Sequence, residues 1–190
     1  MPLQLPPHPR SIDTERLLLR PYIGSDVDWL VQDIRDNREH LAPWVWWAED
    51  KHLPVVETAR ASAEHYLRNY DAQTSWIYGV HVKGRVRQQV RDGAVYQSSL
   101  VGGCDLHWYS EGFGIRYCTL AYWLSQGAEG HGYITEAAKA LMDLAASHET
   151  EVRILHDPKN TKSAAIPKRL GFEYHGVDVS GLSVWSREAP

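Results

Sequence analysis

The residues best suited to hold a phosphorylated ligand lie together between Leu120 and Ala138, in the segment L-A-Y-W-L-S-Q-G-A-E-G-H-G-Y-I-T-E-A-A. An apolar, aromatic run ends at Leu124, a glycine-rich stretch follows, and a helical pattern opens at Ile134. The segment is therefore expected to be a strand, a glycine loop and a helix start. Glycines let a backbone approach a ligand closely, and the free N–H groups of a first helical turn favour phosphate.

The order of these glycines argues against two common nucleotide sites. Gly127-x-x-Gly130-x-Gly132 is not the G-x-G-x-x-G of a dinucleotide fold. The sequence also has no G-K-S or G-K-T, which a nucleoside-triphosphate loop requires. From the loop alone, a phosphate site and a simple tight turn are equally consistent with the pattern.

A second candidate site is an aromatic segment, H-L-A-P-W-V-W-W-A, which contains Trp44, Trp46 and Trp47. Its proline interrupts any helix, so the segment is expected to be a loop. The three indoles could cap an edge of the core, or they could form the wall of a groove that binds the substrate. Both interpretations remain open at this point.

Composition and charge exclude several classes of protein. The 190 residues carry a formal net charge of −4, whereas proteins that bind nucleic acid usually have a basic surplus. No apolar run approaches the roughly 20 residues of a membrane helix, and the first residues do not resemble a signal peptide. Cys104 and Cys118 form no C-x-x-C pair, and Cys104-x-x-His107 lacks a second pair of zinc ligands. We therefore expect a cytoplasmic protein without a metal site.

The elements that must position these residues alternate along the chain. The first ten residues contain four prolines and are expected to be an extended leader, followed by one domain over residues 11–190. The basic segment 83–91 is expected to be a hairpin turn. Apolar periodicity predicts helices over residues 26–37, 54–70 and 132–148 and a last helix after the turn 157–163, and strands over 16–21, 76–82, 94–109, 117–124, 152–155, 172–177 and 182–185. This order indicates an α/β fold with a mixed sheet.

Five segments, taken together and in order, resemble the GNAT superfamily of N-acetyltransferases. They are T-E-R-L-L-L-R-P at 14–21, N-R-E-H-L-A-P-W at 37–44, Y-W-L-S-Q-G-A-E-G-H-G-Y-I-T-E-A at 122–137, D-P-K-N-T-K-S at 157–163 and R-L-G-F at 169–172. The second segment is similar to the group of RimJ and RimL, which acetylate the N-termini of ribosomal proteins. The resemblance spans nearly the whole chain.

This resemblance implies a mixed central sheet, splayed in the middle and flanked by about four helices, with acetyl-CoA in the gap. In such enzymes the pantetheine pairs with the splayed strand, and the pyrophosphate lies on the glycine loop. No metal is implied. The residues then expected to bind the cofactor are Leu120, Tyr122, Trp123, Leu124, Gly127, Gly130, His131, Gly132, Tyr133, Asn160 and Ser163.

The chain departs from the family pattern at two catalytic positions. Many relatives carry a tyrosine at the position of Pro167, where it protonates the leaving thiolate, and that tyrosine is absent here. Within the resembled group a serine suits the same task, so the resemblance assigns proton donation to Ser163, with Asn160 holding the pantetheine or a water. Helix capping is the alternative role for these two residues.

The second departure concerns the general base. Relatives often place a glutamate where this chain has Thr119. By alternation, Asp105, His107 and Tyr109 share one face of the preceding strand, and Glu111 follows in the loop. Asp105 and His107 are the candidate bases, acting through water, although a buried, paired side chain is an equal alternative for each.

Three functions follow from the resemblance. The first is transfer of an acetyl group from acetyl-CoA to the α-amino group of a protein or peptide. The second is acetylation of a small amine such as an antibiotic, a polyamine or an amino-acid analogue. The third is a non-catalytic module that binds CoA. The expected partner is an acceptor amine, neither nucleic acid nor a membrane is expected as a partner, and a homodimer is possible.

Overall fold

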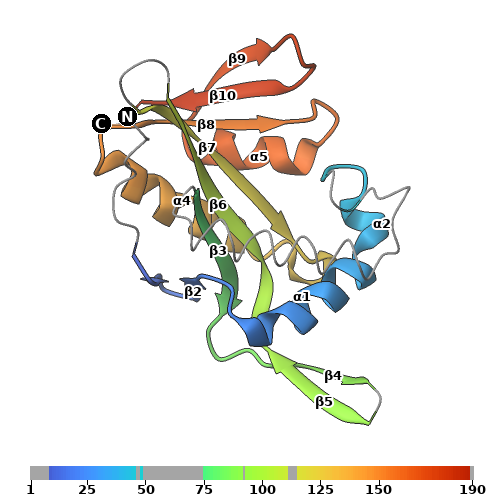
Figure 1. Ribbon diagram of the computed structural model, residues 1–190. Helices are drawn as coiled ribbons and strands as arrows, with labels where there is room; N and C mark the ends of the chain where they lie inside the picture. The colour runs from blue at the N-terminus through green and yellow to red at the C-terminus, as the bar shows by residue number, and fades with distance from the viewer. Residues whose placement is uncertain (1–8, 46–47, 49–74, 92, 111–114, 189–190) are drawn as a thin grey trace.

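A computed structural model describes residues 9–45, 48, 75–91, 93–110 and 115–188 (Figure 1). Within these residues one sheet of eight strands has the order β1-β2-β3-β6-β7-β8-β10-β9, and β4 pairs with β5 in a separate ribbon. The strands of the sheet are β1 Ile12–Asp13, β2 Leu17–Arg20, β3 Ser75–Val82, β6 Leu100–Ser110, β7 Ile115–Leu124, β8 Glu151–His156, β9 Glu173–Val177 and β10 Ser183–Arg187. All neighbours are antiparallel except β7 and β8, which are parallel, so the sheet is mixed.

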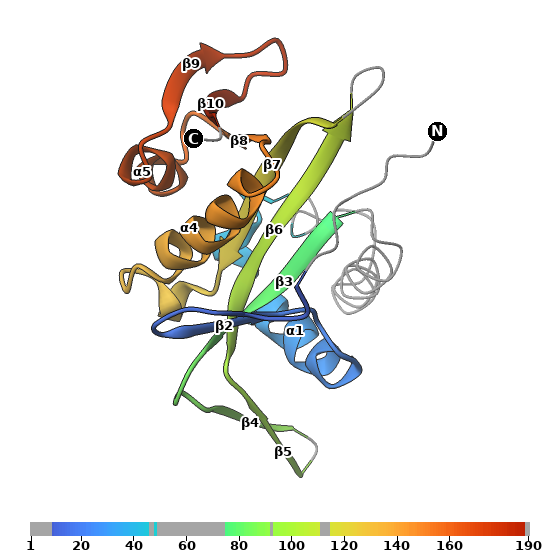
Figure 2. The ribbon, with the colours of Figure 1, turned by 90° about the vertical axis from the view of Figure 1, so that its left-hand side faces the viewer.

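Helices cover both faces of the sheet, as Figure 2 shows from the side. The described helices are α1 Gly24–Asp36, α2 Arg38–Leu41, α4 Tyr133–Ala146 and α5 Thr161–Arg169. One hydrophobic core contains the apolar stripe of α4 and buried residues of α5, and a second core lies beneath α1. Two cores on opposite faces are the expected consequence of a sheet that is covered on both sides.

The sheet is splayed between its two parallel strands. β7 and β8 pair through only three residues, and the last partners are Thr119 and Arg153. Beyond them β7 continues to Leu124 with its outer edge unpaired, while β8 continues its pairing with β10. The backbone N–H and C=O groups of residues 120–124 on that edge are therefore available to an extended ligand. The expectation of a splayed sheet is confirmed.

The long helix and the last helix follow their sequence patterns closely. The apolar stripe of α4 is buried as predicted, and it comprises Ile134, Ala137, Ala138, Leu141 and Ala145. α5 follows the predicted turn and is followed by Gly171, which has a left-handed φ of 73°. The predicted helix over 54–70 and most of the predicted leader lie outside the described residues.

Two local predictions were wrong. The basic segment belongs to a hairpin as predicted but is a turn only at its start, because Arg87–Arg91 forms β4 and pairs with β5, Ala94–Ser98. The single strand predicted over 94–109 is therefore divided into β5 and β6. The first helix begins at Gly24, earlier than predicted. Its reciprocal cap involves Asp26, whose Oδ2 accepts a hydrogen bond of 2.8 Å from the N–H of Ile23.

Candidate active site

The glycine loop joins the free edge of β7 to the N-terminus of α4. A short 3₁₀ turn over residues 126–128 is followed by Gly130 and Gly132, whose φ values of 77° and 76° are left-handed. Gly132 is the N-cap of α4. The N–H groups of Gly132, Tyr133, Ile134 and Thr135 have no acceptor within the helix, so they are directed out of its N-terminus. This is the geometry of an anion site at a helix end.

A side chain from the start of the chain supports this loop. The Arg16 guanidinium donates to the carbonyl of His131 at 2.8 Å and to Oε2 of Glu136 at 2.7 Å. Glu136 also accepts hydrogen bonds from Thr14 Oγ1 and from the Arg16 N–H. Burial raises the pKa of Glu136, but these hydrogen bonds outweigh it and hold the pKa below its ordinary value. Sequence reasoning missed Arg16, although it lies within a motif that carries the family resemblance.

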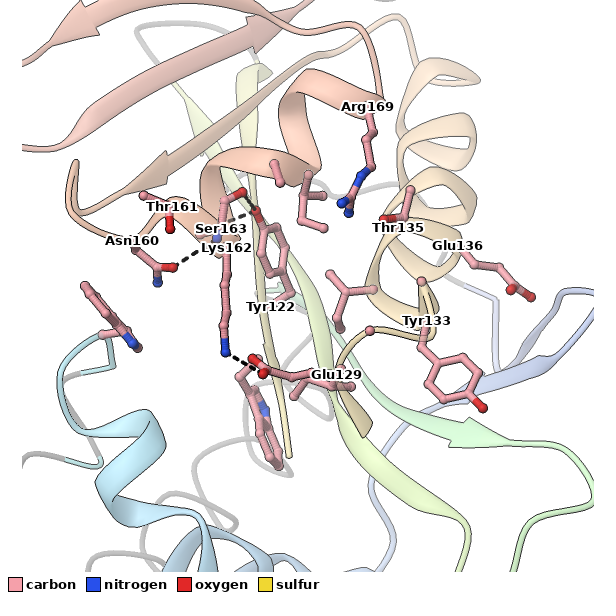
Figure 3. A pocket seen from close by; sticks show the side chains of 18 of the residues that line it. Tyr122, Glu129, Tyr133, Thr135, Glu136, Asn160, Thr161, Lys162, Ser163 and Arg169 are labelled. Carbon is pink, nitrogen blue, oxygen red and sulfur yellow. Dashed lines mark hydrogen bonds and ion pairs between the residues drawn. The ribbon is translucent and has the colours of Figure 1, made fainter. Parts of the chain in front are cut away.

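The predicted catalytic pair lies at the N-terminus of α5. Asn160 is the N-cap, and its Oδ1 accepts a hydrogen bond of 2.9 Å from the N–H of Ser163. The Ser163 Oγ lies 3.1 Å from the hydroxyl of Tyr122, which reaches it from β7 (Figure 3). Asn160 therefore caps α5 through its Oδ1, and its Nδ2 takes no part in the cap. Pro167 sits inside the helix, beyond its first turn.

A cavity of about 1110 Å³ brings these elements together. Of the predicted site residues, the cavity is lined by Trp44, Tyr122, Trp123, Leu124, Gly130, Gly132, Tyr133, Asn160 and Ser163. Trp44 is 43% exposed, so it lies at the rim of the cavity and not in a core. Trp46 and Trp47 lie outside the described residues.

Three predicted cofactor residues are not among those that line the cavity. Leu120 is buried in the core beneath α4, and Gly127 lies in the 3₁₀ turn without a left-handed φ. The His131 ring stacks on Tyr133 with centroids 5.2 Å apart, and its Nδ1 lies 2.8 Å from the carbonyl of Glu129. His131 is exposed beside the loop.

Charged side chains cross the cavity above the loop. Glu129 Oε2 lies 2.5 Å from Nζ of Lys162, and its Oε1 lies 3.4 Å from Nε2 of His40. Figure 3 shows Lys162 reaching down from α5 to Glu129, and Arg169 farther along the same helix. Thr135 Oγ1 is buried in the first turn of α4 and has no hydrogen-bond partner within the described part of the chain. The cavity thus combines cations, a free hydroxyl and a helix N-terminus.

The two candidate bases lie on the other face of the sheet. Asp105 lies opposite Ile77 of β3, which belongs to the core beneath α1, whereas Tyr122 packs against the core beneath α4. Burial raises the pKa of Asp105 to about 8. Its Oδ1 has no hydrogen-bond partner among the described residues. His107 Nδ1 lies 2.9 Å from the hydroxyl of Ser75. The structure does not place either candidate base in the cavity with Ser163.

The other sequence candidates do not assemble a metal site. The residues that the structure describes contain no group of three or more His, Cys, Asp or Glu side chains able to hold a metal ion. Burial raises the pKa of both thiols, that of Cys118 to about 12, so neither is a reactive thiolate. Among the described helices none has both the length and the apolar character needed to cross a membrane. Tyr109 is 45% exposed and stacks on Tyr117, and Glu111 lies outside the described residues.

Comparisons with known proteins agree with this geometry. Residues 16–173 match the family model described as "Acetyltransferase (GNAT) domain". The Bacillus subtilis (strain 168) protein named "Putative ribosomal N-acetyltransferase YdaF" is 28% identical over 173 residues, which are 90% of this chain and 85% of that protein.

Two solved structures share the fold at low sequence identity. One is a Salmonella typhimurium acetyltransferase described as modifying the N-terminal serine of 50S ribosomal subunit protein L7/L12; it has a TM-score of 0.70 at 16% identity, covering 93% of this chain and 97% of that one. The other is the microcin C7 self-immunity acetyltransferase MccE, in complex with acetyl-CoA and AMP. It has a TM-score of 0.69 at 16% identity, covering 92% of this chain and 93% of that one.

Proposed function

The chain belongs to the GNAT acetyltransferase family, and from this premise we propose that it transfers an acetyl group from acetyl-CoA to the N-terminal α-amino group of a protein or peptide. The observation that carries the proposal is a juxtaposition. The unpaired edge of β7, the glycine loop and the hydroxyl of Ser163 all border one cavity. An extended thioester that lies along that edge has its phosphates at one end and its reacting group near Ser163.

The residues of the cavity fit acetyl-CoA. Residues 120–124 offer a strand edge to the amide groups of the pantetheine. The first turn of α4 offers N–H groups and the unpartnered Thr135 hydroxyl to the phosphates. Arg169 lines the same cavity and has no ion-pair partner among the described residues. The cavity therefore offers hydrogen-bonding groups along the whole length of acetyl-CoA.

The acetyl transfer requires two proton movements, and its atoms and charges balance without a metal ion. The neutral amine nitrogen attacks the thioester carbon, an amide C–N bond forms, and the C–S bond breaks with its electron pair on sulfur. The amine loses one proton and the thiolate gains one, so the sum is neutral. Asn160 orients the helix end that carries Ser163, and we assign to Ser163 the proton that reaches the thiolate, which the hydroxyl recovers from water.

Neither candidate base lies in the cavity, and this favours an acceptor that needs little help from a base, such as an α-amino group. Free α-amino groups titrate near pH 8, whereas lysine side chains titrate near 10.4, so an α-amine needs less help from a base. Asp105, with a pKa of about 8, is mostly protonated at neutral pH and could serve as a base only in alkaline solution. His107 remains the second candidate. The relatives named for ribosomal N-acetylation support the same class of acceptor.

A small amine is the second candidate acceptor. Trp44 and Trp123 contribute indoles to the cavity, and such walls can enclose a compact substrate. MccE, an acetyltransferase of this fold, has been solved in complex with both acetyl-CoA and AMP, so a protein of this fold can bind a small molecule as well as acetyl-CoA. The acceptor is therefore best decided by direct assay.

Release of free thiol from acetyl-CoA, measured against a panel of peptides with free N-termini and a panel of small amines, tests this function. We expect release with peptides and a mass increase of one acetyl group at the peptide N-terminus. Release with small amines alone would refute the α-amino assignment. Mass spectrometry of a cell lysate incubated with the protein and labelled acetyl-CoA then identifies the natural acceptor.

The role of Ser163 is tested by Ser163→Ala. We expect kcat to fall at least tenfold while the Kd of acetyl-CoA changes by less than about threefold, because the hydroxyl acts on the departing thiolate. Ser147→Ala is the matched control, since its exposed hydroxyl caps the far end of α4. An equal loss of binding and turnover would mean that Ser163 is only a capping residue.

A further inference from the structure

We propose that Tyr122, which lies on β7, positions Ser163. Its hydroxyl takes the place of the helical N–H that Pro167 cannot donate to the Ser163 carbonyl. The proposal rests on the transfer function above and adds a residue to it.

The first observation is the gap that proline leaves in the helix. In an α-helix the N–H of residue i bonds to the carbonyl of residue i−4, and proline has no N–H. Pro167 lies inside α5, so the carbonyl of Ser163 loses its donor. A buried carbonyl without a partner costs free energy, and another donor is therefore expected to satisfy it.

The second observation identifies that donor. The hydroxyl of Tyr122 donates to the Ser163 carbonyl at 3.1 Å, and it lies 3.1 Å from the Ser163 Oγ as well. Residues 122 and 163 are far apart in sequence and come from a strand and a helix, so only the fold brings them together. Figure 3 shows the ring of Tyr122 reaching from the strand to the first turn of α5.

The consequence for Ser163 concerns the position of its hydroxyl. A serine hydroxyl rotates freely, and its proton can point to any acceptor within reach. The phenol has one proton and gives it to the Ser163 carbonyl, so its oxygen is left as an acceptor 3.1 Å from Oγ, and this contact holds the serine hydroxyl at the cavity that both residues line.

The phenol can keep this role across the working pH range. Burial raises the pKa of Tyr122 well above its ordinary value of 10.0, so the ring stays neutral and its O–H stays a donor. Tyr122 itself transfers no proton in this scheme. It acts through Ser163, which holds the proton for the thiolate.

The test separates the bond to the carbonyl from the contact with Oγ. Tyr122→Phe removes both, so we expect Tm and kcat to fall, with kcat reduced at least tenfold and the KM of acetyl-CoA changed by less than about threefold. Tyr174→Phe is the matched control, because that ring is 49% exposed on β9 and packs on Trp185. Its Tm and kcat should match those of the parent protein.

Pro167→Ala provides the second arm, because alanine returns the N–H that bonds to the Ser163 carbonyl. In the double variant Tyr122→Phe with Pro167→Ala, we expect Tm to recover while kcat stays low. Recovery of both quantities would overturn the proposal, since Tyr122 would then only support the helix. Unchanged kcat in the folded Tyr122→Phe variant would overturn it too.

The experiments distinguish failure of the proposed role of Tyr122 from failure of the transfer function. If the parent protein releases no thiol with any amine, the transfer function itself is wrong. If the parent protein is active and Tyr122→Phe is equally active, only the role of Tyr122 is wrong. Should Tyr122→Phe alone fail to fold, the double variant supplies the measurement, because its restored N–H stabilises α5.

Discussion

Replacing Gly132 with alanine tests whether the glycine loop holds the cofactor pyrophosphate. Gly132 has φ 76° and ψ 9°, a left-handed conformation. A Cβ at this position meets only Arg16 Nη2, at an ordinary contact distance of 3.6 Å, so the substitution causes no clash. The cost is conformational and amounts to about 1–2 kcal/mol for an L-residue in this region.

That cost must appear in stability, in binding or in both. If the loop keeps its conformation, Tm falls by about 2–8 °C for a domain of this size. If the loop relaxes instead, the N–H groups at the start of α4 turn away from the ligand. The same free energy then weakens CoA binding by about 5–30-fold. Thermal denaturation and titration calorimetry with CoA measure the two quantities separately.

Gly127→Ala is the matched control for this prediction. Gly127 lies in the same loop and has no left-handed φ, and a methyl group added there would have no neighbouring atom within 4 Å, so alanine should fit without cost. Its Tm and CoA affinity should stay within about 1 °C and about twofold of the parent values. The pyrophosphate assignment fails if Gly132→Ala lowers Tm but leaves the Kd of CoA unchanged. It fails equally if S-acetylpantetheine, which lacks the pyrophosphate, loses as much affinity as CoA.

Three further substitutions probe charge, burial and the acceptor side. Glu129→Gln removes a carboxylate beside the phosphate loop and releases Lys162, so calorimetry at low salt should show CoA binding tightened by up to about fivefold; weaker binding would contradict this. The folded pKa of Asp105, about 8, is above its ordinary value of 3.8, so between about pH 4 and 8 the carboxyl ionises in the unfolded chain and stays protonated in the folded protein. The free energy of unfolding therefore falls as pH rises through that window. The Tm advantage of Asp105→Asn should grow across that window and then level off, and a difference independent of pH would refute the argument. Trp44→Ala should raise the KM of the acceptor several-fold without changing the Kd of CoA, and the reverse pattern would place Trp44 on the cofactor side.

The fold was most predictable where one face of an element is buried and the other is not. α4 is such an element, and its stripe of apolar residues repeats with the helical period. The β4–β5 ribbon is the opposite case. Val90 and Val95 are 72% and 61% exposed, whereas the half-buried face carries Arg87, Gln89, Tyr96 and Ser98, so apolar residues do not mark the inward face. A basic strand of this kind cannot be distinguished from a turn by hydrophobic pattern alone.

The site was predictable where its chemistry is local in the sequence. The glycine loop and the cap of Asn160 on the N–H of Ser163 each involve neighbours within a few residues, and their spacing is visible in the sequence. The contacts of Arg16 with the His131 carbonyl and of Tyr122 with Ser163 join residues 115 and 41 positions apart. No local spacing encodes such contacts, because they exist only once the sheet has brought the segments together.

A loop with three glycines has a large conformational entropy, so its order must come from elsewhere. Its entrance is held by α1, because Asn37 Oδ1 accepts from the N–H of Gln126 at 2.7 Å and the buried Asp33 accepts from the hydroxyl of Ser125. Burial raises the pKa of Asp33, while hydrogen bonding by Ser125 and the positive charge of Arg87 oppose that rise.

The exit of the loop is held by Arg16, through the carbonyl of His131 and through Glu136 in the first turn of α4. The loop is therefore fixed at both ends by side chains from the first quarter of the chain. A ligand that binds to a loop already held in place loses less entropy on binding than one that must order it. Removing either tether should weaken CoA binding, and Asn37, which does not line the cavity, can act on that binding only through the loop. Arg16→Ala and Asn37→Ala are the direct measurements of that effect, and unchanged CoA affinity in both would show that the glycine loop orders itself.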